Sequence, residues 1–130
     1  MKPFTYVLPK SLAEAGQEAR QADTIIKAAG LDVVDRMKER LLTPQRVVNL
    51  LPLHQELAGI AATGGELRIG ANVTLSELEQ HPALAGAAMA GLRTAAATTA
   101  TPQIRNRATV ACNVLRTSAC TAGAGRPAWR

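Results

Sequence analysis

Aromatic side chains are nearly absent from this chain of 130 residues, in which Phe4, Tyr6 and Trp129 are the only three. The hydrophobic content is nevertheless 47%, which is typical of one folded domain rather than of a disordered chain. The core must therefore be built from alanine, valine, leucine and isoleucine. The chain also lacks the aromatic platforms on which single-strand nucleic-acid binders stack bases.

Long apolar runs are missing as well. No uninterrupted apolar stretch reaches about 18 residues, the length that predicts a membrane-spanning helix. The start at Met1, Lys2 and Pro3 leads into a strand-like segment rather than into the apolar part of a signal peptide. We therefore expect a soluble, cytoplasmic protein with no membrane partner.

Cysteine and histidine are too sparse to predict a metal site. Cys112 and Cys120 have neither the spacing of a zinc site nor that of a redox CxxC pair, so we interpret them as ordinary thiols. His54 and His81 lack a second ligand or a paired carboxylate at helical spacing, which favours surface or capping roles. No nucleophile, base and orienting group align, and no catalytic residue is assigned.

Acidic residues are absent from the last part of the chain. Residues 1–79 hold nine Lys and Arg against ten Asp and Glu, whereas residues 80–130 hold six Arg and no acid. Such asymmetry can mark a nucleic-acid or phosphate partner. The arginines are scattered singly, however, and the sequence favours a protein that binds no nucleic acid. A basic interaction module stays open as a weaker alternative.

The first half of the chain alternates between strand-like and helix-like segments. Residues 4–8 have strand composition, and Ser11 with Glu14 forms a capping-box pattern that predicts a helix over residues 12–20. Residues 24–28 and 46–50 predict two further strands. Between these strands lies a helical pattern, which makes the segment a βαβ unit with parallel strands.

The helix of this unit is expected to begin after Gly30 and to end at Thr43 and Pro44. Its predicted apolar face consists of Val34, Met37 and Leu41.

The second half begins with a predicted hairpin. Residues 58–63 and 66–70 flank Gly64 and Gly65, a pair suited to the positive φ angles of a tight turn. Thr74 and Glu77 form another capping box, which opens a short helix that His81 and Pro82 should close.

The remaining segments carry weaker signals. Residues 83–97 predict a longer, alanine-rich helix, residues 98–107 a connection, and Thr109 with Val110 the start of another strand. From residue 116 onward Ser, Thr, Ala, Gly and Arg replace the periodic apolar pattern, and we expect residues 116–130 to form an unpacked, disordered tail.

Two short segments are candidates for binding a polar ligand. Residues 28–32 join a predicted buried strand to a helix N-terminus, where unpaired N–H groups and the helix dipole suit a phosphate. Most such turns hold only water, however, so this pattern alone is weak evidence. Residues 109–113, preceded by 102–106, gather a hydroxyl, an amide and a guanidinium among small residues; an ordinary polar loop is the alternative.

Beyond these patterns, the chain resembles the flavin-binding subunits of xanthine dehydrogenase-like and carbon monoxide dehydrogenase-like molybdenum enzymes. The likeness runs from Met1 to about Leu115. Its densest blocks keep the order and spacing of that family and lie at residues 37–44, 48–50, 67–71 with Thr74, 101–106 and 108–110.

The resemblance implies FAD as the cofactor. In that family one loop of the form AGGT or AGGHS and a second of the form TIGGN cradle the FAD pyrophosphate. Carried over, the cofactor-binding residues are Ala28, Ala29, Gly30, Leu31 and Asp32 in the first loop and Thr109, Val110, Ala111, Cys112 and Asn113 in the second.

Both loops depart from the family pattern. Ala29 replaces the first glycine, Leu31 replaces a small hydroxylated or polar residue, and Ala111 with Cys112 replaces a glycine pair. Where the family glycines need positive φ, a Cβ costs about 1 kcal/mol or more, and its bulk obstructs the phosphate. We therefore expect reduced flavin affinity.

The resemblance also implies the fold and the partners. The expected fold is α+β, the first FAD-binding subdomain of the vanillyl-alcohol-oxidase (PCMH) type, over residues 1–115 as a partial domain. A truncated gene or a shifted reading frame would explain the change of pattern at residue 116. The implied function is electron transfer beside a molybdopterin-binding large subunit and a 2Fe-2S small subunit. A degenerate fragment without flavin binding or activity is the alternative.

Overall fold

The computed structural model describes residues 1–115, so the tail predicted over residues 116–130 lies outside the described part. The elements follow the chain in this order: β1 (Thr5–Val7), α1 (Leu12–Ala19), β2 (Thr24–Lys27), α2 (Leu31–Lys38), β3 (Arg46–Asn49), η1 (Leu51–Leu53), α3 (His54–Leu57), β4 (Ile60–Thr63), β5 (Glu66–Ile69), α4 (Leu75–Gln80), η2 (Pro82–Leu84), η3 (Ala87–Met89), α5 (Ala90–Thr98), α6 (Pro102–Arg105) and α7 (Val110–Val114).

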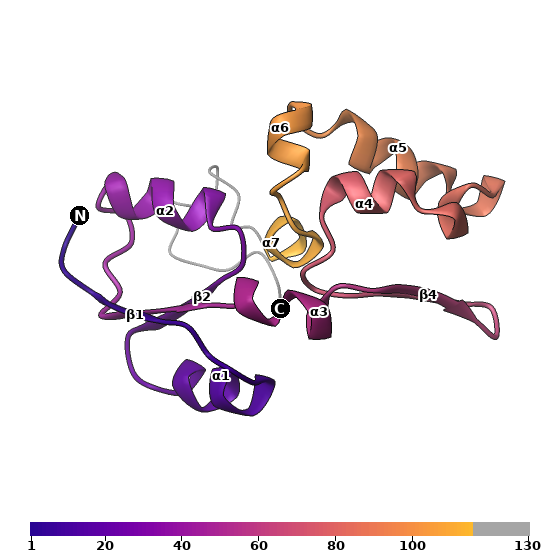
Figure 1. Ribbon diagram of the computed structural model, residues 1–130. Helices are drawn as coiled ribbons and strands as arrows, with labels where there is room; N and C mark the ends of the chain where they lie inside the picture. The colour runs from indigo at the N-terminus through magenta and orange to yellow at the C-terminus, as the bar shows by residue number, and fades with distance from the viewer. Residues whose placement is uncertain (116–130) are drawn as a thin grey trace.

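The first part of the molecule is a three-stranded parallel sheet in the order β1-β3-β2. Helices α1 and α2 lie on opposite faces of this sheet (Figure 1). The central strand β3 is covered on both faces, and Val47 and Val48 are 1% and 0% exposed. This arrangement confirms the parallel βαβ unit predicted from residues 24–50.

Helix α1 begins at Leu12 with Ser11 as its N-cap, as the sequence predicts, but only half of the capping box forms. The Ser11 hydroxyl accepts a hydrogen bond from the Glu14 N–H at 3.2 Å. The Glu14 carboxylate instead accepts from the Lys10 N–H at 2.7 Å. The helix is still capped at its first turn, because one orphan N–H is satisfied by Ser11 and the acid lies at the positive end of the dipole.

Helix α2 ends earlier than predicted. It stops at Lys38, and Arg40 follows with a left-handed φ of 60° while the Leu41 N–H donates to the Arg36 carbonyl at 2.9 Å. A left-handed residue ends a helix because the N–H groups after it bond to carbonyls of the last helical turn. The helix therefore ends before the predicted stop at Pro44. Leu41 is consequently 64% exposed, and only Met37 of the predicted apolar face is buried.

The hairpin and the capped helix after it are confirmed. Strands β4 and β5 pair antiparallel around Gly64 and Gly65, whose φ angles are 62° and 82°. Thr74 and Glu77 form the complete capping box of α4. His81 ends that helix and accepts a hydrogen bond at Nδ1 from the Ala83 N–H at 3.2 Å, which is the capping role predicted for it.

Three predictions for the second half are wrong. The expected helix over residues 83–97 is divided into η2, η3 and α5, because Gly86 adopts extended backbone with φ −74° and ψ 154°. The expected connection over residues 98–107 contains the short helix α6. Thr109 and Val110 start no strand: Thr109 forms an isolated bridge with Thr74, and Val110 begins α7.

Two clusters of aliphatic side chains hold the fold together. Ala15, Val48 and Leu53 form one beside the parallel sheet. Val73, Leu78, Leu84 and Ala96 form the other, between α4, α5 and the hairpin. Parallel and antiparallel sheets with separate helices make this the α+β class that was predicted. Within residues 1–115, no helix has the length and apolar character needed to cross a membrane.

Candidate functional site

The first predicted segment, residues 28–32, is the turn between β2 and α2. Gly30 is the N-cap residue of α2 and has a left-handed φ of 82°. It offers no side chain to cap the helix, so the orphan N–H groups of the first turn are left to other acceptors. An eight-residue helix with this kind of start favours an anion at its positive end.

The Lys27 side chain is bonded to this turn. This side chain is buried, and its Nζ donates to the Ala28 carbonyl at 3.2 Å and to Asn49 Oδ1 at 3.1 Å. The amine also lies 5.4 Å from the centre of the Tyr6 ring. A Cβ on Gly30 would approach Lys27 Cδ to 2.9 Å, closer than side chains tolerate. Glycine is therefore favoured here mainly by its positive φ, because the contact is with a flexible lysine side chain that can shift.

The second predicted segment, residues 109–113, is the start of α7 rather than an open loop. The Val110 N–H donates to the Val73 carbonyl at 2.8 Å and the Ala111 N–H to the Ala71 carbonyl at 3.1 Å. These two N–H groups are therefore already engaged. The Asn113 amide donates to the Thr109 carbonyl at 2.9 Å, which ties the segment to its own first residue.

The expected strain at the replaced glycines is absent. Ala29, Ala111 and Cys112 are not among the residues with positive φ in the described chain, and the last two lie inside a helix. The conformational cost was expected only where φ must be positive, so it does not apply at these positions. The added bulk of their side chains stays as the reason to expect weaker contact with a phosphate.

A cavity of about 240 Å³ brings the two segments together. Ala29, Leu31 and Asp32 line it from the first segment, and Cys112 and Asn113 from the second. Its other lining residues come from α2 and from the region before α7: Asp35, Thr99, Ala100, Ile104 and Ala108. Five of the ten residues predicted from the sequence thus share one cavity, although the two segments begin 81 positions apart.

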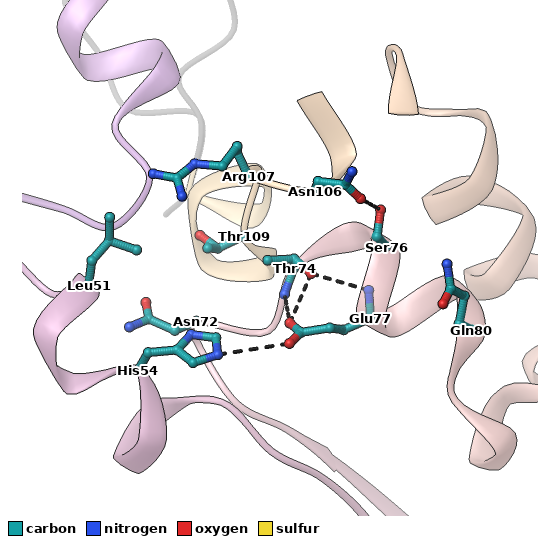
Figure 2. A pocket seen from close by; sticks show the side chains of 10 residues that line it. All are labelled: Leu51, His54, Asn72, Thr74, Ser76, Glu77, Gln80, Asn106, Arg107 and Thr109. Atoms are coloured by element: carbon teal, nitrogen blue, oxygen red, sulfur yellow. Dashed lines mark hydrogen bonds and ion pairs between the residues drawn. The ribbon is translucent and has the colours of Figure 1, made fainter. Parts of the chain in front are cut away.

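A larger cavity of about 610 Å³ is lined in part by Thr109 (Figure 2). Only Thr109 among the predicted cofactor residues lines it. The other lining residues are mostly polar: Leu51, His54, Asn72, Thr74, Ser76, Glu77, Gln80, Asn106 and Arg107. Elements η1, α3, α4 and the connection between α6 and α7 supply them, together with the chain before α4.

Glu77 organises one wall of this larger cavity. Its Oε2 accepts hydrogen bonds from the Thr74 N–H at 2.7 Å and the Thr74 hydroxyl at 2.8 Å, and its Oε1 lies 3.8 Å from His54 Nε2. Burial raises the pKa of the Glu77 carboxyl, but the bonds from Thr74 and the field of His54 lower it more. Its pKa therefore lies below the ordinary value, and the carboxylate form is favoured.

Sequence reasoning missed most of this cavity. The capping box of Thr74 and Glu77 was visible, but nothing in its spacing indicates that His54 lies opposite. Asn72 and Thr109 are 0% and 1% exposed, and Asn72 Oδ1 and Thr109 Oγ1 have no hydrogen-bond partner in the described residues. Burial of single polar atoms cannot be derived from the sequence pattern.

The family model and the similar proteins both indicate an FAD-binding domain. The family model described as "FAD binding domain in molybdopterin dehydrogenase" matches residues 2–124. The nicotinate dehydrogenase FAD-subunit of Eubacterium barkeri is 32% identical over 121 residues, 91% of this chain and 40% of that subunit. The aldehyde oxidoreductase FAD-binding subunit PaoB of Escherichia coli (strain K12) is 33% identical over 128 residues, 92% of this chain and 37% of that subunit. The chain thus spans about two fifths of these relatives.

Two solved structures also match the fold of this chain. Quinoline 2-oxidoreductase from Pseudomonas putida 86 superimposes with a TM-score of 0.82 at 30% identity, covering 91% of this chain and 41% of that chain. The Cu,Mo-CO dehydrogenase superimposes with a TM-score of 0.79 at 33% identity, covering 88% and 41%. The fold described above is therefore shared with part of each of these two solved structures.

Proposed function

The chain belongs to the family of FAD-binding domains in molybdopterin dehydrogenases, and from this membership we propose that it binds FAD through residues 28–32 and 109–113. Its relatives are named as FAD-binding subunits of a nicotinate dehydrogenase and an aldehyde oxidoreductase. The proposed assembly would include a molybdopterin-binding subunit and a 2Fe-2S subunit, from which a flavin held by this chain would receive electrons. Bound FAD supplies the redox-active ring, and the chain binds and orients it.

The residues present fit the pyrophosphate at the first segment. Gly30 offers no side-chain cap to the first turn of α2, and Ala29, Leu31 and Asp32 at this positive end of the helix line the 240 Å³ cavity. At the second segment the fit is different, because the Val110 and Ala111 N–H groups already have carbonyl partners. There the buried Thr109 hydroxyl, which lacks a partner among the described residues, is the group available to the cofactor.

The observation that carries this proposal is the shared cavity. Two segments far apart in the chain both line it, and each was selected from the sequence for the same ligand. Because Ala29 and Leu31 on one side and Cys112 on the other narrow this space, FAD binding should be weak. We expect the purified chain to be colourless and to bind FAD only when it is added.

Titration of FAD into the full chain, followed by flavin fluorescence, tests the proposal. A variant with Ala29→Gly, Leu31→Thr, Ala111→Gly and Cys112→Gly should bind FAD about tenfold more tightly, a gain of ~1.4 kcal/mol. Since bulk rather than charge is removed, this gain should be the same at low and high salt. Ala85→Gly, at an exposed position outside both cavities, is the control and should leave affinity unchanged.

Two results would count against the proposed FAD binding. Absence of saturable FAD binding in both proteins overturns the proposed function and favours the degenerate fragment. Equal affinity of the two proteins would mean that the substituted side chains do not obstruct the cofactor.

A further inference from the structure

The larger cavity contains two buried polar atoms that nothing in the described chain satisfies. Asn72 Oδ1 and Thr109 Oγ1 have no hydrogen-bond partner within residues 1–115, and both residues are almost fully buried. Folded proteins satisfy nearly all such groups, so each exception calls for a physical reason. A bound ligand is one such reason when the atoms face a cavity.

The orientation of Asn72 fixes what it can bind. Its Nδ2 donates to the Leu50 carbonyl at 2.8 Å, which leaves Oδ1 as the end that faces the cavity. Figure 2 shows this oxygen and the Thr109 hydroxyl pointing to the space between Leu51 and Thr109. The Asn72 Oδ1 can only accept a hydrogen bond from a ligand, whereas the Thr109 hydroxyl can donate or accept.

Arg107 adds a donor at the same place. Its guanidinium extends over the space above Thr109 in Figure 2. The side chain is exposed, so its guanidinium is accessible to a ligand. By contrast, Arg105 lies 3.4 Å from Glu79 and is ion-paired. The cavity therefore combines a strict acceptor, a strict donor and a hydroxyl that can be either.

This combination selects among ligands. A phosphate alone offers acceptors and no reliable donor to Asn72, and it would face the Glu77 carboxylate in the same cavity. A flat ring would need apolar or aromatic walls, and among the ten lining residues only Leu51 is aliphatic. Neighbouring hydroxyl groups, each of which donates and accepts, match the three protein groups.

We propose that Asn72, Arg107 and Thr109 form a binding site for the vicinal hydroxyls of a sugar or polyol. The proposal rests on the proposed function, because Thr109 also belongs to the second cofactor segment. Two parts of FAD carry such hydroxyls: the ribose of its adenosine half and the ribitol of its flavin half. Each places them a short distance from the pyrophosphate.

Thr109→Val is the central test. Valine keeps the shape and removes the hydroxyl, which makes no cap bond to α7. Without ligand the variant should unfold at an equal or higher denaturant concentration than the wild type, because an unsatisfied buried oxygen is removed. Its FAD affinity should nevertheless fall about tenfold. Opposite signs for stability and binding distinguish a ligand contact from a structural role.

Calorimetry of the full chain with ADP and with FMN identifies the source of the hydroxyls. If the ribose occupies the site, Thr109→Val and Arg107→Gln weaken ADP about tenfold and leave FMN unchanged, and 2′-deoxy-ADP binds the wild type as weakly as ADP binds the variants. If the ribitol occupies it, the two variants weaken FMN alone. Either pattern supports the site. Thr98→Val, on the exposed face of α5, is the matched control.

Failure of this inference is separable from failure of the proposed function. If FAD binds to the wild type and both variants retain its full affinity, the polyol site is wrong and flavin binding stands. If no titration of FAD, ADP or FMN saturates, both the polyol site and the proposed FAD binding are wrong.

Discussion

The two cofactor segments differ in how much of their backbone is available. Around Gly30 a left-handed residue starts an eight-residue helix without a side-chain cap. Around Thr109 the next two N–H groups are bound to the Val73 and Ala71 carbonyls, and the segment continues as a short helix. Segments that resemble two phosphate loops in sequence therefore present different chemistry: a helix end in one, a buried hydroxyl in the other.

This contrast comes from different physical origins. The first turn is shaped locally by the glycine and by Lys27, which belongs to the strand just before it. The second is shaped by packing against residues 71–74, almost 40 positions earlier. Substitutions in the first segment should accordingly change stability through the dihedral preferences of its own backbone. Substitutions in the second segment should act through its packing against residues 71–74.

The largest effect is expected at Gly30. In Gly30→Ala the left-handed φ costs about 1–2 kcal/mol, and the new Cβ meets Lys27 Cδ at 2.9 Å. We expect a loss of about 2 kcal/mol or slightly more in the free energy of unfolding, measured by urea denaturation. Gly16→Ala, where a Cβ meets nothing within 4 Å inside α1, is the control and should stabilise instead. An unchanged midpoint for Gly30→Ala would mean that the turn is not held as described.

Glycine introduced into the second segment should also destabilise the protein, but by less. Ala111 lies in α7, so Ala111→Gly should lower the free energy of unfolding by about 0.5–1 kcal/mol, through the flexibility of the unfolded chain. Ala29→Gly, outside any helix, serves as the comparison. Equal losses at both positions, measured by thermal unfolding without FAD, would contradict the difference between the segments.

The capping box that holds Thr74 beside Thr109 gives a prediction about pH. Because the folded-state pKa of Glu77 is lowered, its contribution is fully present above the unfolded-state value of about 4.5 and is lost as pH falls through the folded value. Glu77→Gln should therefore cost less than about 1 kcal/mol at pH 7, since the side chain is half exposed to solvent. Below pH 4 the two proteins should converge. Glu66→Gln, on the exposed hairpin, should show no such dependence.

The smallest effect is expected at Ala100, which lines the shared cavity with a φ of 52°. Ala100→Gly relieves this conformation but adds freedom to the unfolded chain, so the net change should stay within about 0.5 kcal/mol. FAD affinity should rise or stay equal, because a methyl group leaves the cavity. A marked loss of affinity would show that this wall of the cavity positions the ligand.

The sequence by itself determined the features that depend on a few adjacent residues. Gly64 and Gly65 defined the hairpin, Thr74 and Glu77 the start of α4, and Gly30 the turn into α2, because dihedral preference and capping act over one to four residues. The family resemblance added the fold class and FAD, through blocks in a fixed order.

Only the tertiary structure decided what lies between distant segments. The Thr109 segment became a helix because residues 71–74 bind its backbone, and a β-branched pair alone suggested a strand. The cavity shared by residues 29 and 112, the unsatisfied Asn72 and Thr109, and His54 beside Glu77 likewise result from packing. Burial and partner choice depend on the whole chain, since each polar atom is satisfied or orphaned by residues that its own sequence neighbours do not specify.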